Sequence, residues 1–374
     1  MKIVIINGFS TYSHRVELLY NYFKTRDNQV NVLYANFDHI KKEAYNLEKN
    51  DYFPIDTKPY YKNLSIKRLL SHFHFAKRAI KFAETLSPEM IYVVLPPNSL
   101  AFFAAKYKQK NKNIKLVYDI IDLWPETLPY KNTTEVFPFS IWKNLRNKNL
   151  NSADKIIVEC NLFGKVIKKY DDSLQVNTLY MANKNVAVDI QPSIDNTYFD
   201  ICYLGSINNI IDIEEIILIL KELNRYKNVC LHIIGDGENR IKLIEGLEYN
   251  SIQYKYYGKV YDYEEKADIM NRCIFGLNIM KDTVCVGLTM KSIDYFQFGL
   301  PLLNNIKEDT NNIVNDYKVG FNLYDNHREV AKKIKEMKRN EFIHMKHKAR
   351  AVYEKYFSED VFEIKADSIF YRKD

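Results

Sequence analysis

Residues 199–240 read FDICYLGSINNIIDIEEIILILKELNRYKNVCLHIIGDGENR, and this stretch decides the fold that we predict. The run Phe199–Leu204 is rich in residues typical of strands, and the segment Ile213–Asn224 follows it with the apolar spacing of a helix. A second apolar run, Val229–Ile234, leads through Gly-Asp-Gly into another helical pattern that begins at Arg240. Strands separated by helices of this length form parallel sheets with helices on both faces.

The same alternation extends in both directions along the chain. In the C-terminal half, further strands are expected at Ile252–Tyr257, Ile274–Ile279, Leu300–Leu303 and Gly320–Leu323. In the N-terminal half, strands are expected at Lys2–Ile6, Val30–Tyr34, Met90–Leu95, Ile114–Asp119, Lys155–Glu159 and Val176–Tyr180. The prediction is an α/β protein with two Rossmann-like domains, residues 1–182 and 199–350, and a linker at 183–198. A C-terminal helix at 351–374 is expected to return to the first domain.

Composition limits the class of protein. The chain has 374 residues, of which 47% are apolar, so two domains can each bury a core. No apolar run approaches the ~18 residues of a membrane span, and no signal-peptide pattern opens the chain, so we expect a cytoplasmic protein. The five cysteines are scattered, which favours buried thiols over a metal site or a disulfide framework. A glycine fingerprint for dinucleotides is missing after the first strand, which disfavours an oxidoreductase.

Charge is divided unevenly between the two halves. Residues 1–185 contain 28 Lys and Arg against 17 Asp and Glu, whereas residues 186–374 contain 26 against 30. Basic and bulky apolar residues interleave at Ser65–Phe82 and at Phe137–Asn149. Each segment fits either a helix on an anionic membrane surface or a core helix with a solvated basic face. Nucleic acid is not expected as a partner, because no recognition module accompanies the charge.

Two stretches of the second domain predict a phosphate site. Gly205 and Ser206 follow the first strand, where a glycine lets the backbone approach a ligand and Ser206 offers an N–H and a hydroxyl; an ordinary turn has the same pattern. The stretch 284–301, VCVGLTMKSIDYFQFGLP, offers Thr289 as a helix N-cap. Lys291 then lies in the first helical turn, where the helix dipole disfavours a cation unless an anion is bound there. A solvated pair of Lys291 and Asp294 is the alternative.

These motifs, in this order, resemble the C-terminal half of GT-B fold glycosyltransferases, closest to the family 4-type enzymes of bacterial surface polysaccharide synthesis. The motifs are the Gly-Ser turn, IIGDGENR at 233–240, YGKV at 257–260, and KSIDY with GLP at 291–301. The resemblance covers about 199–325; in the first half it rests on YDIIDLWPE at 118–126, which is similar to amino-sugar transferases of that group. It implies two facing Rossmann-like domains, a nucleotide-sugar donor (a UDP-sugar) on the second, an acceptor on the first, and retaining transfer without a metal or other cofactor.

The resemblance also implies roles for individual residues. Donor-binding residues are expected to be Gly205, Ser206, Val260, Thr289, Lys291, Ser292, Asp294 and, across the cleft, Arg15. Acceptor-binding residues are expected to be Gly8, His14, Asp119, Trp124 and Glu126. Asp122 is expected to take or position the acceptor's proton, and Lys291 to offset charge on the leaving group. For Arg15 the alternative is a solvated residue at the start of a helix, and for the carboxylates of 119–126 it is an ordinary structural role.

The sequence departs from the family's pattern at the donor site. Where the family has two Glu residues separated by seven positions, this chain has Val286 and Asp294. Ser206 stands where the family has Arg, and the position of a family Lys falls near Ile211. The resemblance as a whole predicts transfer of a sugar from a nucleotide-diphosphate donor to a hydroxyl of a saccharide. The acceptor is expected to be lipid-linked and used in cell-surface polysaccharide synthesis. The enzyme is expected to act at the cytoplasmic face of the membrane. The alternatives are a non-catalytic partner subunit with the same fold, and a sugar-nucleotide epimerase.

Overall fold

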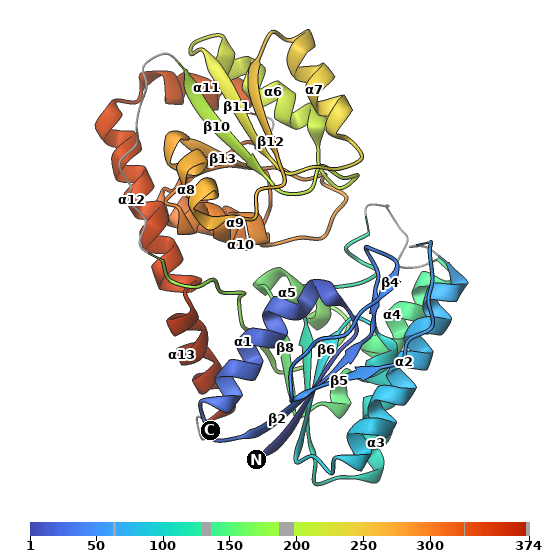
Figure 1. The fold of residues 1–374 in the computed structure, drawn as a ribbon. Helices are drawn as coiled ribbons and strands as arrows, with labels where there is room; N and C mark the ends of the chain where they lie inside the picture. Colours follow the sequence, from blue (N-terminus) through green and yellow to red (C-terminus); the bar gives the residue numbers. More distant parts are fainter. Residues whose placement is uncertain (63–64, 129–135, 187–197, 325, 372–374) are drawn as a thin grey trace. The chain divides into compact units, whose positions relative to one another are not determined.

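The computed structural model describes residues 1–62, 65–128, 136–186, 198–324 and 326–371. The chain divides into two compact units, the first formed by Met1–Tyr180 with a C-terminal segment from Ala366, and the second by Met181–Lys365. Each unit contains one parallel sheet flanked by helices, so the predicted α/β class is confirmed (Figure 1). Of the expected linker, residues 183–186 belong to the second unit, and 187–197 lie outside the described residues.

The first unit is built on a seven-stranded sheet in the order β5-β2-β1-β6-β7-β8-β9, with every pair of neighbours parallel. Its strands are β1 (Lys2–Asn7), β2 (Gln29–Ala35), β5 (Tyr52–Ile55), β6 (Met90–Leu95), β7 (Lys115–Ile120), β8 (Lys155–Val158) and β9 (Val176–Thr178). A short antiparallel pair, β3 (Phe37–Asp38) and β4 (Glu43–Ala44), lies outside this sheet. The unexpected strand β5 contains Pro54, which is tolerated because β5 lies at the sheet edge.

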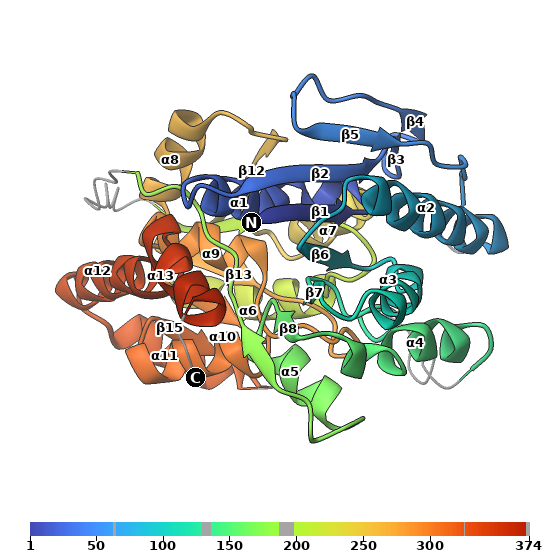
Figure 2. The same ribbon diagram turned by 90° about the horizontal axis from the view of Figure 1, so that it is seen from below.

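Helices cover the first sheet. They are α1 (Ser13–Lys24), α2 (Ile66–Thr85), α3 (Ser99–Lys110), α4 (Phe139–Asn147), α5 (Asn161–Lys168) and the C-terminal end of α13 (Glu359–Phe370), with 3-10 turns at Ser10–Tyr12 and Leu150–Ser152. Figure 2 shows α2, α3 and α4 side by side along one side of the sheet. Helix α2 begins at the N-cap Ser65, whose Oγ accepts from the N–H of Arg68. Its later turns are buried, whereas Ile66 and Leu70 in its first turns are exposed.

The second unit has six parallel strands in the order β12-β11-β10-β13-β14-β15. The strands are β10 (Phe199–Leu204), β11 (Val229–Ile234), β12 (Gln253–Gly258), β13 (Phe275–Asn278), β14 (Leu302–Asn304) and β15 (Gly320–Asn322). The chain starts in the middle of the sheet at β10, runs outward to β12, and returns to add β13 beside β10. The strand order therefore reverses between β10 and β13, and ligands of such sheets bind beyond the carboxyl ends of the strands at this point.

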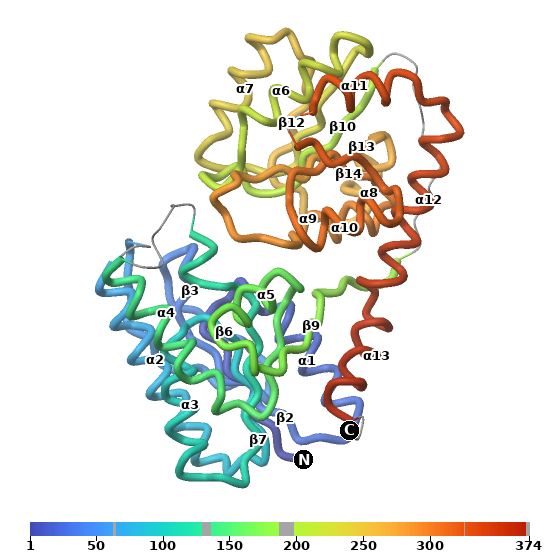
Figure 3. Tube along the Cα trace, turned by 180° about the vertical axis from the view of Figure 1, so that it is seen from behind, coloured from blue at the N-terminus to red at the C-terminus, as the bar shows by residue number. Residues whose placement is uncertain are grey.

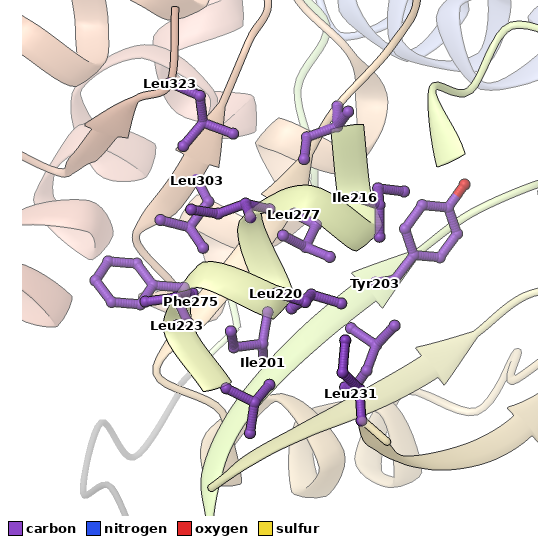
Figure 4. Packing of buried hydrophobic residues seen from close by; sticks show 14 of the residues in the cluster. Ile201, Tyr203, Ile216, Leu220, Leu223, Leu231, Phe275, Leu277, Leu303 and Leu323 are labelled. Atoms are coloured by element: carbon purple, nitrogen blue, oxygen red, sulfur yellow. The ribbon is translucent and has the colours of Figure 1, made fainter. Parts of the chain in front are cut away.

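The helices of the second unit are α6 (Ile213–Asn224), α7 (Arg240–Tyr249), α8 (Tyr263–Arg272), α9 (Met290–Gln297), α10 (Asp309–Tyr317), α11 (His327–Glu336) and α12 (Arg339–Tyr356). Helix α12 runs along α9 and α10 (Figure 3). In the core, strand residues Ile201, Leu231 and Leu277 are buried together with residues of α6, Ile216, Leu220 and Leu223 (Figure 4). Among the described residues, no helix is both long enough and apolar enough to cross a membrane.

Candidate functional site

Lys291, on α9, lies at the reversal point of the second sheet. Its Nζ is 3.3 Å from the carbonyl oxygen of Ile279, which follows β13, and 5.3 Å from the centre of the Tyr203 ring on β10. The Tyr203 hydroxyl in turn donates to the carbonyl of Ser206 at 2.9 Å. The ammonium group, the Gly205–Ser206 turn and the end of β13 therefore converge where this fold class binds ligands.

The electrostatics of Lys291 are unusual for a lysine. It forms no ion pair with any residue that the structure describes, and its side chain is at least half buried. Burial lowers the pKa of Lys291 to about 7. An ammonium group without a carboxylate partner in a desolvated position favours binding of an anion, which would restore the charged form.

Glycines allow the loops at this edge to pack closely. Gly205 has a φ of +116° and open space where a Cβ would lie, so the turn is accessible from that side. A Cβ on Gly235, which has a φ of +140°, would lie 2.0 Å from the carbonyl oxygen of Gly205. A Cβ on Gly237 would lie 2.4 Å from the carbonyl oxygen of Ile207. The Gly-Asp-Gly motif thus lets the loop after β11 support the turn after β10.

The start of α9 is capped as the sequence predicted. Thr289 Oγ1 accepts from the N–H of Ser292 at 3.2 Å and donates to Asn278 Oδ1 at 2.8 Å. Asn278 Nδ2 donates to Asn304 Oδ1 at 2.8 Å, and Asn304 Nδ2 donates to Asn322 Oδ1 at 2.7 Å. These asparagines end three adjacent strands, so a line of amides along the carboxyl edge fixes the position of the helix N-terminus.

Tyr295 attaches the next turn of α9 to the same strands. Its buried hydroxyl accepts from the N–H of Leu204 at 2.7 Å and lies 3.3 Å from the carbonyl oxygens of Cys202 and Leu277. Its ring packs on Gly276, where a Cβ would approach ring atoms to 2.6 Å. Sequence reasoning missed this residue, because an apolar helical stripe does not show which tyrosine hydroxyl finds a backbone partner.

The remaining expected donor residues lie around this edge. Asp294, on α9, accepts from Asn183 Nδ2 at 2.8 Å and remains half buried. Ser206 is exposed, Ser292 is buried with its hydroxyl 2.6 Å from that of Thr289, and Val260 is 9% exposed just after β12. Val286 and Ile211, at two family positions for charged residues, pack against the core of the unit. At these two positions apolar packing takes the place of the family's charged residues, whereas Ser206, at the third, is exposed.

The structure gives Arg15 a different place from both roles expected for it. Its side chain is fully buried, with Nε 2.8 Å and Nη2 3.1 Å from the carboxylate oxygens of Asp119. Nη1 donates to the carbonyl of Tyr180, and the hydroxyl of Tyr92 donates to Asp119 at 2.7 Å. The expectations that Arg15 reaches phosphates and that Asp119 binds acceptor are therefore corrected: these groups form a buried ion pair inside the first unit.

Glu126 is also engaged in an ion pair. Its carboxylate receives two bonds from the buried Arg146, at 2.6 and 3.2 Å. Gly8 is required for packing, because a Cβ there would lie 2.3 Å from Cδ of Pro97. His14 is exposed at the start of α1. Neither Glu126 nor Gly8 needs a ligand to explain its position.

Asp122 differs from its two neighbouring carboxylates, because the contacts seen for it are with hydroxyl groups. Thr127 Oγ1 donates to it at 2.5 Å, and the hydroxyl of Tyr12 lies 3.4 Å away. Burial raises the pKa of Asp122, and these hydrogen bonds partly oppose the shift. A half-buried carboxylate after the carboxyl end of β7 is placed to accept a proton.

Glu159 is a second carboxyl group at this edge that sequence reasoning missed. It follows β8, the neighbour of β7, and its N–H donates to the carbonyl of Ile120. Burial, with the charges of Asp122 and Asp119, raises the pKa of Glu159 to about 8, although Arg15 opposes this. A carboxyl group with this pKa is mostly protonated at pH 7. Its place after a strand was the available signal, but the sequence pattern assigned it to the strand itself.

One group of possible metal ligands occurs among the described residues: Asp200, Cys230 and His232, with ligand atoms within 4.8 Å of one another. Asp200 and Cys230 lie near the amino ends of their strands, away from the edge that carries Lys291. Both nitrogens of His232 have protein partners, Asp200 at 2.7 Å and the Tyr257 hydroxyl at 2.9 Å. This hydrogen bonding accounts for the buried histidine as a core residue.

Comparison with known proteins gives a match in structure only. No family model matches the sequence, and no curated protein matches it. Among solved structures, the chain is similar to the lipopolysaccharide outer core galactosyltransferase WaaB, with a TM-score of 0.66 and 13% identity over 99% of both chains. It is similar to HepE of Anabaena in complex with UDP, with a TM-score of 0.69 and 13% identity over 98% of this chain and 99% of that one.

A third similar structure is sucrose-phosphate synthase of Thermosynechococcus elongatus, with a TM-score of 0.74 and 10% identity over 99% of this chain and 98% of that one. At these identities the similarity establishes the fold. The chain has the GT-B fold, with two Rossmann-like units, and the resemblance read from its motifs is confirmed at this level.

Proposed function

We propose that this protein is a glycosyltransferase that moves a sugar from a nucleotide-diphosphate donor to a hydroxyl of a saccharide. The observation that carries the proposal is the Lys291 ammonium, which has no carboxylate partner among the described residues and lies beside the open Gly205–Ser206 turn at the reversal point of a parallel sheet. A UDP-sugar is the proposed donor, and the similar protein HepE has been solved with UDP and with UDP-glucose.

The diphosphate would bind between Lys291 and the N-terminus of α9. The N–H groups of a helix start and one ammonium group together match an anion, and the same ammonium offsets charge that develops on the leaving group. Asp294, oriented by Asn183, would accept hydrogen bonds from the ribose hydroxyls. Ser206, Ser292 and Val260 complete the proposed donor contacts. The proposal includes transfer without a metal ion and with retention of configuration.

The acceptor would bind at the carboxyl edge of the first sheet. Asp122 is the proposed base or positioning group for the acceptor hydroxyl, because Asp119 and Glu126 are held by arginines. We propose a lipid-linked saccharide of cell-surface polysaccharide synthesis as the acceptor, and peripheral binding at the cytoplasmic face of the membrane. Support comes from the exposed apolar and basic side chains of the first turns of α2.

A screen of nucleotide sugars by thermal unfolding tests the donor. A donor that binds only the folded protein at 100 times its Kd stabilises it by about 2.7 kcal/mol, a rise in Tm of several degrees. We expect a UDP-sugar to give the largest rise, with product formed only when an acceptor is added. Conversion of the donor alone would indicate an epimerase, and absence of any stabilisation would contradict the proposal. The anomeric configuration of the product, read by NMR, tests retention.

A further inference from the structure

The first unit contains a cavity of about 260 Å³ between the N-terminal turns of α2 and α4. Its lining includes Ile66, Leu69 and Arg68 from α2, Phe139 and Trp142 from α4, and Trp124 from the loop after β7. The lining is mainly apolar, and the volume is slightly below the range of about 300–1,000 Å³ found for small-molecule pockets. The cavity therefore has room for a segment of an apolar chain and little room for a sugar with its hydration.

Large apolar side chains next in sequence to the lining residues of this cavity are exposed to solvent. Ile66 is 74% exposed, Phe137 is 75% exposed, and Leu70 and Ile141 are each more than half exposed. Neighbouring exposed apolar residues of this kind mark a binding surface more often than isolated ones do. They lie on the first turns of α2 and on or next to α4, the two helices that line the cavity.

Positive charge accompanies this apolar surface. Lys62 and Lys67 are exposed and form no ion pair with any residue in the described part of the chain. The backbone of Lys62 lies next to the cavity, because its carbonyl accepts from the Oγ of Ser65, which lines the cavity and is the N-cap of α2. Among the residues that line the cavity, Cζ of Arg68 lies 4.7 Å from the centre of the Trp124 ring. An apolar cavity that is lined by one cation, with two exposed lysines close to its lining residues in the sequence, is complementary to a hydrocarbon chain that carries an anionic head group.

Trp124 links the cavity to the proposed acceptor site. It lines the cavity, and it is two residues after Asp122 in the same loop. Its carbonyl is fixed by Asn98 and by Arg146, at 2.8 and 2.9 Å, so the loop has a defined position relative to α4. A ligand in the cavity would therefore place its polar end within reach of the loop that carries Asp122.

We propose that the cavity between α2 and α4, called the groove from here on, binds the hydrocarbon chain of an anionic lipid-linked acceptor, with Arg68, Lys62 and Lys67 facing its phosphate. The inference deepens the proposed function and rests on it for the identity of the ligand as an acceptor. The groove holds the part of one lipid molecule next to the head group, and this contact selects amphiphilic acceptors over free saccharides.

The two tryptophans of the chain provide a direct readout. The sequence contains only Trp124 and Trp142, and both line this cavity. We would titrate the full chain with an alkyl phosphate that is brominated on its chain, below its micelle concentration, and follow quenching of tryptophan emission. Bromine quenches on contact, so the wild-type protein should show saturable quenching, with weaker binding of the matching brominated alcohol, which lacks the charge.

Ile66→Ser tests the groove, and Ile241→Ser is its matched control. Ile66 lines the cavity, whereas Ile241 lies on α7 in the second unit and is similarly exposed at 62%. Because both side chains are exposed, neither change removes core packing. Loss of the Ile66 side chain should weaken binding of the alkyl phosphate about fivefold or more, while Ile241→Ser should bind as the wild type does.

The outcomes separate this inference from the proposed function. Stabilisation by a UDP-sugar should be equal in wild type, Ile66→Ser and Ile241→Ser, and its absence in all three would contradict the proposed function alone. Quenching that does not saturate, or that is equal in both variants, would overturn the proposal that the groove binds a lipid chain. Quenching by brominated lipid in bilayer vesicles but not by the dissolved alkyl phosphate would also overturn it, because the surface would then contact a membrane without binding a single chain.

Discussion

Lys291 keeps its ammonium near one carbonyl oxygen and one aromatic ring, with no carboxylate beside it among the described residues. Transfer of a charge out of water without a partner is costly, so this position is unfavourable for stability in the free protein. In the function proposed above, a bound diphosphate would supply the missing counter-charge. Lys291 would then lower the stability of the free protein and raise its affinity for the anion.

Lys291→Ala should weaken UDP binding without harming the fold. A hydrogen bond to a charged group contributes about 1.5–3 kcal/mol, which corresponds to a rise in Kd of about 10- to 150-fold. Lys221→Ala, at an exposed lysine of α6, is the control and should leave the Kd unchanged. Isothermal titration calorimetry with UDP measures both. Equal affinity in wild type and Lys291→Ala would remove the anion site from the proposal.

The lowered pKa of Lys291 predicts how stability depends on pH. The folded protein loses this proton near pH 7, whereas the unfolded chain retains it until about pH 10.5, so unfolding takes up a proton between these values. The free energy of unfolding should therefore rise with pH across this window, by less than about 1.4 kcal/mol per pH unit. Lys291→Met should lack this rise. Urea unfolding from pH 6.5 to pH 9.5 in both proteins tests the difference, and parallel curves would contradict it.

Asp119 and Asp122 lie three positions apart, and their substitution should give opposite results. Asp119→Asn leaves the buried Arg15 guanidinium without its carboxylate, which should lower the free energy of unfolding by about 3–5 kcal/mol. Asp122→Asn keeps the hydroxyl contacts and should cost little stability, but it should lower transfer by about 100-fold or more. Asp172→Asn, at an exposed carboxylate, is the neutral control. Urea unfolding and a transfer assay separate the two roles.

At the scale of elements, α9 presents Lys291, and Tyr295 fixes α9 to the sheet. Tyr295→Phe leaves the buried N–H of Leu204 unpaired, which should cost about 1–3 kcal/mol of stability and weaken UDP binding, because the helix start would shift. Tyr263→Phe is the matched control, since the buried hydroxyl of Tyr263 has no hydrogen-bond partner among the residues that the structure describes. A loss of stability in Tyr295→Phe with unchanged UDP affinity would limit Tyr295 to a structural role.

The sequence predicted those elements whose pattern is local. The bounds of β10, β11 and α6 agree with their apolar patterns, because a buried parallel strand is a continuous apolar run and an amphipathic helix repeats its own spacing. Strand β5 was missed because it contains a proline, and α10 because its sequence, DTNNIVNDY, has few apolar residues. These elements are stabilised by tertiary packing, which local propensity does not report.

The residues of the candidate site also fall into those that the local sequence could predict and those that depend on contacts between distant parts of the chain. Thr289 and Lys291 could be located because a cap and a helix dipole act within one turn of chain. The pairing of Arg15 with Asp119 joins residues 104 positions apart, and spacing in the sequence does not reveal it. The raised pKa of Glu159 depends on burial beside Asp122 and Asp119, which arises only when the parallel strands β7 and β8 bring their carboxyl ends together.

At the scale of the whole molecule, the charge is segregated along the chain. Residues 1–185 have 11 more basic than acidic residues, although the complete chain has a net charge of only +7. Exposed lysines of the first unit, including Lys62 and Lys67, lie beside the exposed apolar residues of α2. Such a surface is attracted to anionic lipid, with each lysine near the membrane contributing about 1 kcal/mol, whereas the acidic half gains nothing from the same field.

Binding to anionic vesicles should therefore depend on the first unit and on salt. Reversing two charges, Lys62→Glu with Lys67→Glu, should reduce the vesicle-bound fraction of the wild-type chain strongly, with a change in partition of about 10-fold or more. The matched control, Lys221→Glu with Lys255→Glu in the second unit, should bind as the wild type does. Co-sedimentation at low salt and at about 0.5 M salt measures both effects, because screening at high salt removes attraction between exposed charges. Vesicle binding that both high salt and the Lys62/Lys67 reversal leave unchanged would show that the segregated charge does not direct this protein to a membrane.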